Sequence, residues 1–233
     1  MKSNLLLTYR LITYNIKVIF ANKFIYFVLA ALAFFGFIIS ITILGDPDFR
    51  ESVMFGFLLF PGVLIIFYPI AYGIQNDDDS KMLETIFGIP NYRYKVWLIR
   101  FAITQLVAVI MLSFLGIIAN VALYRFEIIP MIMQVLFPIT FLSAVGFMLS
   151  TLIKNGNGTA ISLVVIGLFF FILYEPLEES VWNVFLNPFA APTDMSEFIW
   201  INIVFKNRVY LSIGSVLCLL FGLYNLQLRE KFI

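Results

Sequence analysis

Six long runs of apolar residues divide the sequence, and polar or charged residues separate each run from the next. A helix needs about 20 mostly apolar residues to cross the hydrocarbon core of a bilayer, which is about 30 Å thick. Only the fifth run, with 16 residues, falls clearly short of this length. The runs are Phe24–Leu44, Ser52–Ile74, Val96–Tyr124, Ile128–Ile153, Thr159–Tyr174 and Val209–Leu226. We therefore predict an all-α integral membrane protein with six transmembrane helices.

The composition supports this fold class. Hydrophobic residues make up 62% of the 233 residues and charged residues 12%, about half of the roughly 25% found in soluble domains. A soluble domain of this size could not bury so much apolar surface, and disordered chains are rich in charge instead. Membrane lipid is therefore the expected solvent of this chain. The net charge of +1 gives no reason to expect nucleic acid as a partner.

The sequence lacks the residue types on which most enzymes and metal sites depend. It contains no histidine and one cysteine, Cys218, so the commonest general base and metal ligand is missing and no intramolecular disulfide can form. It also contains no G-x-x-x-x-G-K-[ST] motif for nucleotide phosphates. We expect no catalytic, metal-binding or cofactor-binding residue in this chain. An intramembrane enzyme would need a reactive pair at membrane depth, and the runs contain none.

The distribution of charge predicts the orientation. With the N-terminus in the cytoplasm, eleven of the 15 basic residues and five of the 14 acidic residues lie inside. The formal charge is then +6 inside and −5 outside, as the positive-inside rule requires. We predict that both termini are cytoplasmic in a bacterial-type inner membrane.

The region before the first run is basic and amphipathic. Residues 1–23 place Arg10 and Lys17 on one narrow helical stripe, which predicts an N-terminal amphipathic helix at the membrane surface; a simple basic leader is the alternative. The first run could also be a signal peptide ending at Ala31-Leu32-Ala33. Because uncharged residues continue as far as Leu44, an uncleaved anchor is the favoured interpretation.

These features divide a single transmembrane domain, residues 1–233, into six parts. They are an interfacial helix at 1–23, two spans at 24–74, a cytoplasmic loop at 75–95, three spans at 96–174, an external loop at 175–208, and the last span with its tail at 209–233.

The loop at 75–95 contains the signals of a short helix. Asp79 or Ser80 can cap its start, and Gly88 and Pro90 end it. Its residues Leu83, Ile86 and Phe87 form one apolar face, with Met82 beside it. That face could pack against the membrane domain of the same chain or bind in the groove of a partner. The composition does not distinguish these alternatives.

The segment Asp77–Arg100 resembles the cytoplasmic coupling segment of type-two ATP-binding cassette (ABC) transporter permeases. In that family an acidic stretch precedes a leucine–glutamate pair, two apolar residues, a proline and a basic residue. The residues that match in order are Leu83, Glu84, Ile86, Phe87, Pro90 and Arg93, with Arg100 in place of a lysine. Lys81 and Ile99 stand where the family has glycine. The number of predicted spans and the long external loop also resemble the family.

The resemblance implies a permease subunit whose coupling helix binds a separate ATPase subunit, where ATP and Mg would be bound. The residues implied to contact the ATPase are Met82, Leu83, Glu84, Ile86, Phe87, Pro90 and Arg93. It further implies a second permease copy or a paralogue. We expect an exporter of an apolar or amphipathic substrate, and the alternative is a non-transporting scaffold or sensor subunit with the same fold.

The external loop at 175–208 is rich in apolar residues. Two segments, around Val181–Leu186 and Phe198–Ile203, are separated by Asn187-Pro188 and by Pro192. They predict two short re-entrant or interfacial helices before the last span, which would complete the short fifth span. A plain surface loop is the alternative.

No acidic or basic residue lies in the centre of a predicted span, which argues against a proton-driven transporter. The polar residues there are uncharged and are interpreted first as interhelical hydrogen bonds and second as contacts along a substrate pathway. They include Thr104, Gln105, Ser113, Asn120, Gln134 and Thr140.

Overall fold

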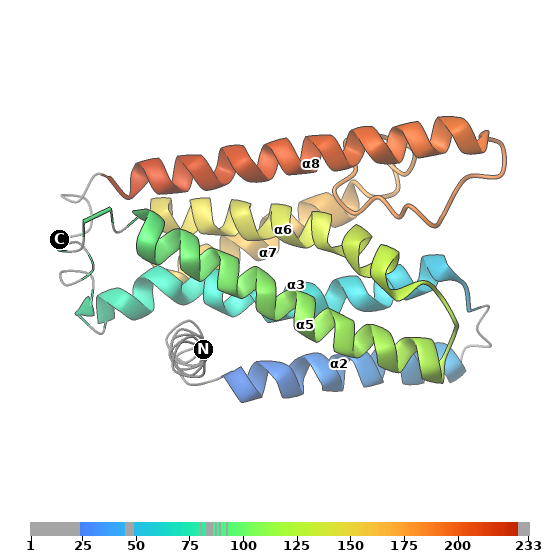
Figure 1. Cartoon of the computed structure of the whole chain (residues 1–233), viewed down its shortest axis with the longest axis horizontal. Coiled ribbons are helices and arrows are strands. Elements are labelled where there is room, and N and C mark those ends of the chain that lie inside the picture. Colours follow the sequence, from blue (N-terminus) through green and yellow to red (C-terminus); the bar gives the residue numbers. More distant parts are fainter. Residues whose placement is uncertain are drawn as a thin grey trace, which may run out of the picture.

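The computed structural model describes residues 24–44, 49–79, 81–82, 86, 88, 90–91 and 93–227. In this part of the chain the structure is a bundle of six long helices and contains no strand (Figure 1). The helices are α2 (Phe24–Leu44), α3 (Glu51–Asp79), α5 (Ile99–Ala122), α6 (Ile128–Ile153), α7 (Gly156–Ile172) and α8 (Glu197–Asn225). A π-helical turn, η1 (Arg93–Leu98), leads directly into α5. The all-α prediction is confirmed, and the predicted helix at 1–23 lies outside the described residues.

Four of these helices are long and apolar enough to cross a membrane. They are α3, the continuous helix Tyr94–Ala122, α6 and α8. The apolar stretches Val28–Thr42 of α2 and Gly156–Ile172 of α7 are shorter. The described chain is therefore compatible with a multi-pass membrane protein, while the arrangement with six spans stays a prediction.

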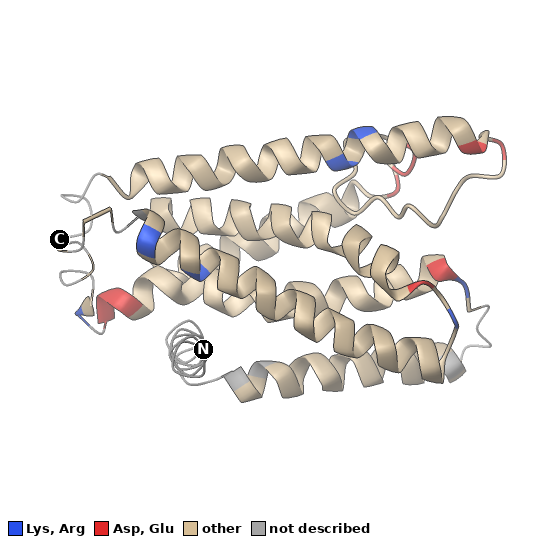
Figure 2. Ribbon diagram, viewed as in Figure 1, with Lys and Arg blue, Asp and Glu red and all other residues tan. Residues whose placement is uncertain are grey.

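Successive helices run in opposite directions, so the bundle has two distinct ends (Figure 1). The loop end holds residues 173–196, between α7 and α8. The segment end, where α3 ends and η1 begins, holds the described residues 81–82, 86, 88 and 90–91. Helix α6 lies centrally and contacts α3, α5, α7 and α8, whereas α2 packs on α3. Most charged residues of the described chain gather at the two ends, and a pair of basic residues within α8 is an exception (Figure 2).

The largest apolar cluster includes the region where α3 meets α6 and α5. Gly62 of α3 lies there, and a Cβ at this position would overlap the side chain of Ile139 and come within 3.2 Å of Leu112. Leu58, Leu112 and Ile139 are all fully buried in the largest apolar cluster. The absence of a side chain at Gly62 therefore allows α3 to approach its neighbours closely, as small residues do in membrane helix packing.

The region before the last helix differs from the prediction. Residues 173–196 form a series of turns without a helix, and α8 begins at Glu197 and continues unbroken to Asn225. The prediction of two short re-entrant helices was wrong, because the second apolar segment belongs to α8 itself. Lys206 and Arg208 had marked this stretch as a loop, but the helix accommodates them: Lys206 is exposed, and Arg208 is buried with polar partners.

The packing at Gly62 generates a stability prediction. We expect Gly62→Val to lower the stability of the purified protein by about 1–3 kcal/mol, because the added atoms overfill a close-packed contact. Gly56→Val is the matched control on the same helix, since a Cβ at Gly56 meets no atom within 4 Å. Thermal unfolding in detergent measures both. Equal losses for the two variants would contradict the close approach at Gly62.

Candidate functional site

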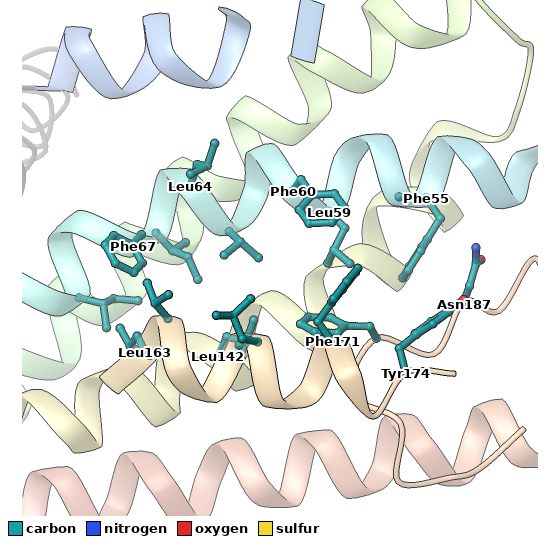
Figure 3. A pocket seen from close by; sticks show the side chains of 18 residues that line it. Phe55, Leu59, Phe60, Leu64, Phe67, Leu142, Leu163, Phe171, Tyr174 and Asn187 are labelled. Atoms are coloured by element: carbon teal, nitrogen blue, oxygen red, sulfur yellow. The ribbon is translucent and has the colours of Figure 1, made fainter. Parts of the chain in front are cut away.

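An apolar cavity of about 710 Å³ lies between α3 and α7 (Figure 3). Its walls include Phe55, Leu59 and Phe67 of α3, and Leu163 and Phe171 of α7. Other lining residues, among them Leu64, Val164 and Leu168, are also exposed on the surface of the bundle. The cavity therefore opens to the surroundings of the protein along the line where α3 and α7 meet.

The polar side chains of the cavity wall, Tyr174 and Asn187, both come from the α7–α8 loop. Burial, and secondarily the charge of Glu178, raise the pKa of the Tyr174 phenol above its ordinary value, so this group remains neutral at physiological pH. No lining residue is acidic or basic. The cavity thus suits an apolar molecule that has at most one uncharged polar group at the loop end.

The intramembrane polar residues singled out from the sequence do not line this cavity. Two interhelical hydrogen bonds involve them: Thr140 donates to Gln105 Oε1 at 3.1 Å, and Gln134 Oε1 accepts from Arg208 Nε at 2.8 Å. The others bond locally. Thr104, Ser113 and Asn120 donate to the backbone oxygens of Arg100, Val109 and Phe126 respectively. The structure therefore places them between or along helices rather than around the cavity.

An ion pair fastens the segment end of the bundle. The Arg100 guanidinium donates to the Asp77 carboxylate, and Arg100 also lies over the Trp97 ring, 5.1 Å from its centroid. Asp77 is only 3% exposed. The pair joins the last turn of α3 to the start of α5, so it connects the two ends of the segment that resembles a coupling segment. The sequence interpretation had placed Asp77 in the loop at 75–95 and missed this contact.

Part of the predicted coupling helix packs on its own chain. Met82 and Ile86 are helical, and Ile86, 4% exposed, is buried in a cluster. The other buried members of that cluster are Ile74, Trp97, Phe147, Leu223 and Leu226. In this conformation Ile86 is not accessible to a partner, whereas Pro90 is exposed. Leu83, Glu84 and Phe87 lie outside the described residues, and Arg93 begins η1.

The loop end is held together by amide and guanidinium side chains that the sequence interpretation missed. Asn207 Nδ2 donates to the backbone oxygens of Val181 and Asn183, both at 2.8 Å. Asn187 Nδ2 donates to the backbone oxygen of Ser52 at 2.8 Å, which ties the loop to the start of α3. These bonds add to the turn hydrogen bonds within the loop backbone and attach the loop to α8 and α3. The adjacent Asn207-Arg208 pair inside an apolar stretch was the available signal.

No family model, curated protein or solved structure matches this chain. Within the described residues, no group of three or more histidine, cysteine, aspartate or glutamate side chains could hold a metal ion.

The Asp77–Arg100 pair generates a second prediction. Removing one partner breaks a buried ion pair, so we expect Asp77→Asn and Arg100→Gln each to cost about 3–5 kcal/mol of stability. The double variant should lose clearly less than the sum of the two, because it leaves no lone charge. Thermal unfolding in detergent measures the stability of the two single variants and the double variant. Asp78→Asn, which changes an exposed neighbour, is the control. Additive losses would show that the two side chains do not interact.

Proposed function

We propose that this chain is the membrane permease subunit of an ABC transporter, and that it exports an apolar or amphipathic substrate. A separate ATPase subunit would bind at the segment end, which would face the cytoplasm. The observation that carries this proposal is that α3 connects the two functional regions: residues from Phe55 to Ile70 line the cavity, and Asp77 in its last turn holds the segment through Arg100.

A single helix that joins the two regions provides a mechanical link. The Asp77–Arg100 pair fixes the segment to α3 and α5 at its two ends, and Ile86 fixes its middle to the cluster that includes Phe147 of α6. A force applied to the segment by a partner would therefore move α3 relative to α7. Because those two helices form opposite walls of the cavity, such a movement would change its shape.

The cavity supports the proposed substrate class. Its volume of about 710 Å³ lies within the range of about 300–1,000 Å³ that is common for small-molecule sites. The uncharged lining and the opening between α3 and α7 favour a molecule that enters from lipid. The neutral polar groups of Tyr174 and Asn187 would bind its polar end.

The backbone of the segment supports the resemblance to ABC permeases. Lys81, which stands where that family has glycine, has a φ of 56°. This left-handed conformation is one that glycine adopts freely and that other residues seldom adopt. Lys81 thus has the backbone conformation that a glycine at this position would favour.

The energy for transport would come from outside this chain. Because the sequence has no P-loop motif, ATP and Mg would be bound by two ATPase subunits. A second copy of the permease or a paralogue would complete the complex. The transporter would alternate between two conformations, driven by ATP-dependent closure of the ATPase dimer.

The docking of the ATPase gives a third prediction. We expect Leu83→Asp and Phe87→Asp to abolish co-purification with the ABC ATPase of the same genome that binds the unaltered chain, because a charge would enter an apolar contact. Glu179→Lys, an exposed charge reversal at the loop end, should leave co-purification unchanged. Failure of every ABC ATPase to bind the unaltered chain, or binding that survives both aspartates, would contradict this docking site. Binding without ATP-dependent substrate movement would favour the scaffold or sensor alternative.

The cavity gives a fourth prediction. Gly167 lies in its wall, and a Cβ there would meet no atom within 4 Å, so Gly167→Trp should fill the cavity without disturbing the fold. We expect binding of a fluorescent single-chain amphiphile to the protein in lipid nanodiscs to weaken on the order of tenfold, about 1.4 kcal/mol. Gly36→Trp on α2, which also has open space and lies outside the cavity, is the control. Equal binding by the two variants would argue against a ligand in this cavity.

A further inference from the structure

Arg208 is a buried cation whose hydrogen-bond partners in the described chain are all uncharged. It is 6% exposed and lies well inside α8, which begins at Glu197. Burial of an unpaired charge is expensive, and an apolar residue would normally be more stable at such a position. The environment of Arg208 therefore requires an explanation beyond stability.

The three donor groups of the guanidinium connect three parts of the structure. Nε donates to Gln134 Oε1 of α6 at 2.8 Å, Nη1 to Asn207 Oδ1 at 2.7 Å, and Nη2 to the backbone oxygen of Leu186 at 3.0 Å. The ring of Phe137 covers the guanidinium, 5.6 Å from its carbon. The rigid, planar arrangement of arginine donors suits simultaneous contacts of this kind, which the single nitrogen of lysine could not reproduce.

The loop residue that Arg208 holds lies between two residues of the cavity wall. Leu186 is flanked by Phe185 and Asn187, both of which line the cavity. Asn187 lies beside Phe55 at the loop end of the cavity (Figure 3), and its side chain bonds to Ser52 at the start of α3. The contact of Arg208 with Leu186, together with the Asn187–Ser52 bond, therefore holds the loop where it closes this end of the cavity.

We propose that Arg208 is a positioning residue that keeps the α7–α8 loop seated across the loop end of the α3–α7 cavity, and thereby controls access of water and solutes to the cavity from that end. The guanidinium suits this role because it can donate a hydrogen bond to water in place of the backbone oxygen of Leu186 when the loop moves away. An apolar side chain could not exchange its contact with the loop for a contact with water in this way. The proposal concerns this chain alone and does not require that an ATPase bind to it.

The test measures the accessibility of a thiol inside the cavity. Cys218→Ser removes the native thiol, and Gly56→Cys places a new one in the cavity wall near the loop, where a side chain has open space. Gly73→Cys, also in open space, reports on the opposite end of the same helix. The rate of reaction with a charged, water-soluble maleimide is measured for the purified protein in detergent.

In the Cys218→Ser background, Arg208→Met removes the cation, and Gln134→Leu removes one of its hydrogen-bond acceptors. We expect each to accelerate labelling of Gly56→Cys by about tenfold or more, which corresponds to about 1.4 kcal/mol, while labelling of Gly73→Cys stays within about twofold. Lys206→Gln is the matched control, because it neutralises an exposed cation two residues away on α8. It should leave both rates unchanged.

Two results would overturn the proposal. One is an unchanged labelling rate at Gly56→Cys in both variants. The other is an equal acceleration at both reporter positions, which would mean that the bundle loosens as a whole and that Arg208 has only a structural role. If Arg208→Met fails to yield folded protein, Gln134→Leu carries the test alone, since it keeps the cation and removes a single acceptor. ATPase binding is absent from this assay, so its result is independent of the proposed transport function.

Discussion

The bundle depends on the requirement that buried polar groups be satisfied by the protein itself. Regular helices meet this requirement with their own backbone bonds, whereas the α7–α8 loop combines its turn bonds with side-chain donors from α8. At the segment end, Arg100 of α5 pairs with the side chain of Asp77 in α3. At the loop end, Asn207 and Arg208 of α8 donate to backbone oxygens of the loop. These side chains allow irregular backbone to lie against an otherwise apolar bundle.

Helix α3 takes part in the contacts at both ends of the bundle and also lines the cavity. Its first turn accepts a hydrogen bond from Asn187 of the loop, its middle forms one wall of the cavity, and its last turn contains Asp77. Close packing against α6 at Gly62 holds the helix to the centre of the bundle. A displacement at either end of α3 therefore reaches the cavity through a continuous helix. In the proposed transporter this helix would carry the mechanical signal from the ATPase to the substrate.

The sequence predicted the parts of the fold that follow from hydrophobic length alone. The bounds of α2 and α6 match the predicted runs, because charged or polar residues flank both runs in the sequence. Helix α8 was predicted too short, since Lys206 and Arg208 resemble loop residues when their surroundings are unknown. Hydropathy cannot distinguish a solvated arginine from one whose donors are satisfied by Gln134 and Leu186.

The residues of the candidate site could not be predicted, because they are far apart in the sequence and meet only in the folded bundle. Asp77 and Arg100 are 23 residues apart, and nothing in their local sequence indicates that they pair. The cavity is formed by α3 and α7, which are separated in the chain by η1, α5 and α6. Its position depends on how the helices pack, and a pattern of apolar residues does not determine which faces meet. The interpretation of the loop at 75–95, in contrast, rests on turn residues and apolar spacing that are local in the sequence, and it stays a prediction.

The two contacts differ in chemistry, and the difference bears on how the bundle could move. At the segment end, opposite charges meet in a buried pair, and separating them without new partners would leave charges buried in an apolar environment. At the loop end, a single cation bonds to neutral oxygens, and such hydrogen bonds exchange with water at modest net cost. The segment should therefore stay joined to α3 and α5 while the loop is the part that yields. In the proposed transporter, which would receive force at one end and release its substrate at the other, this asymmetry would allow the loop to open while the segment stays in place.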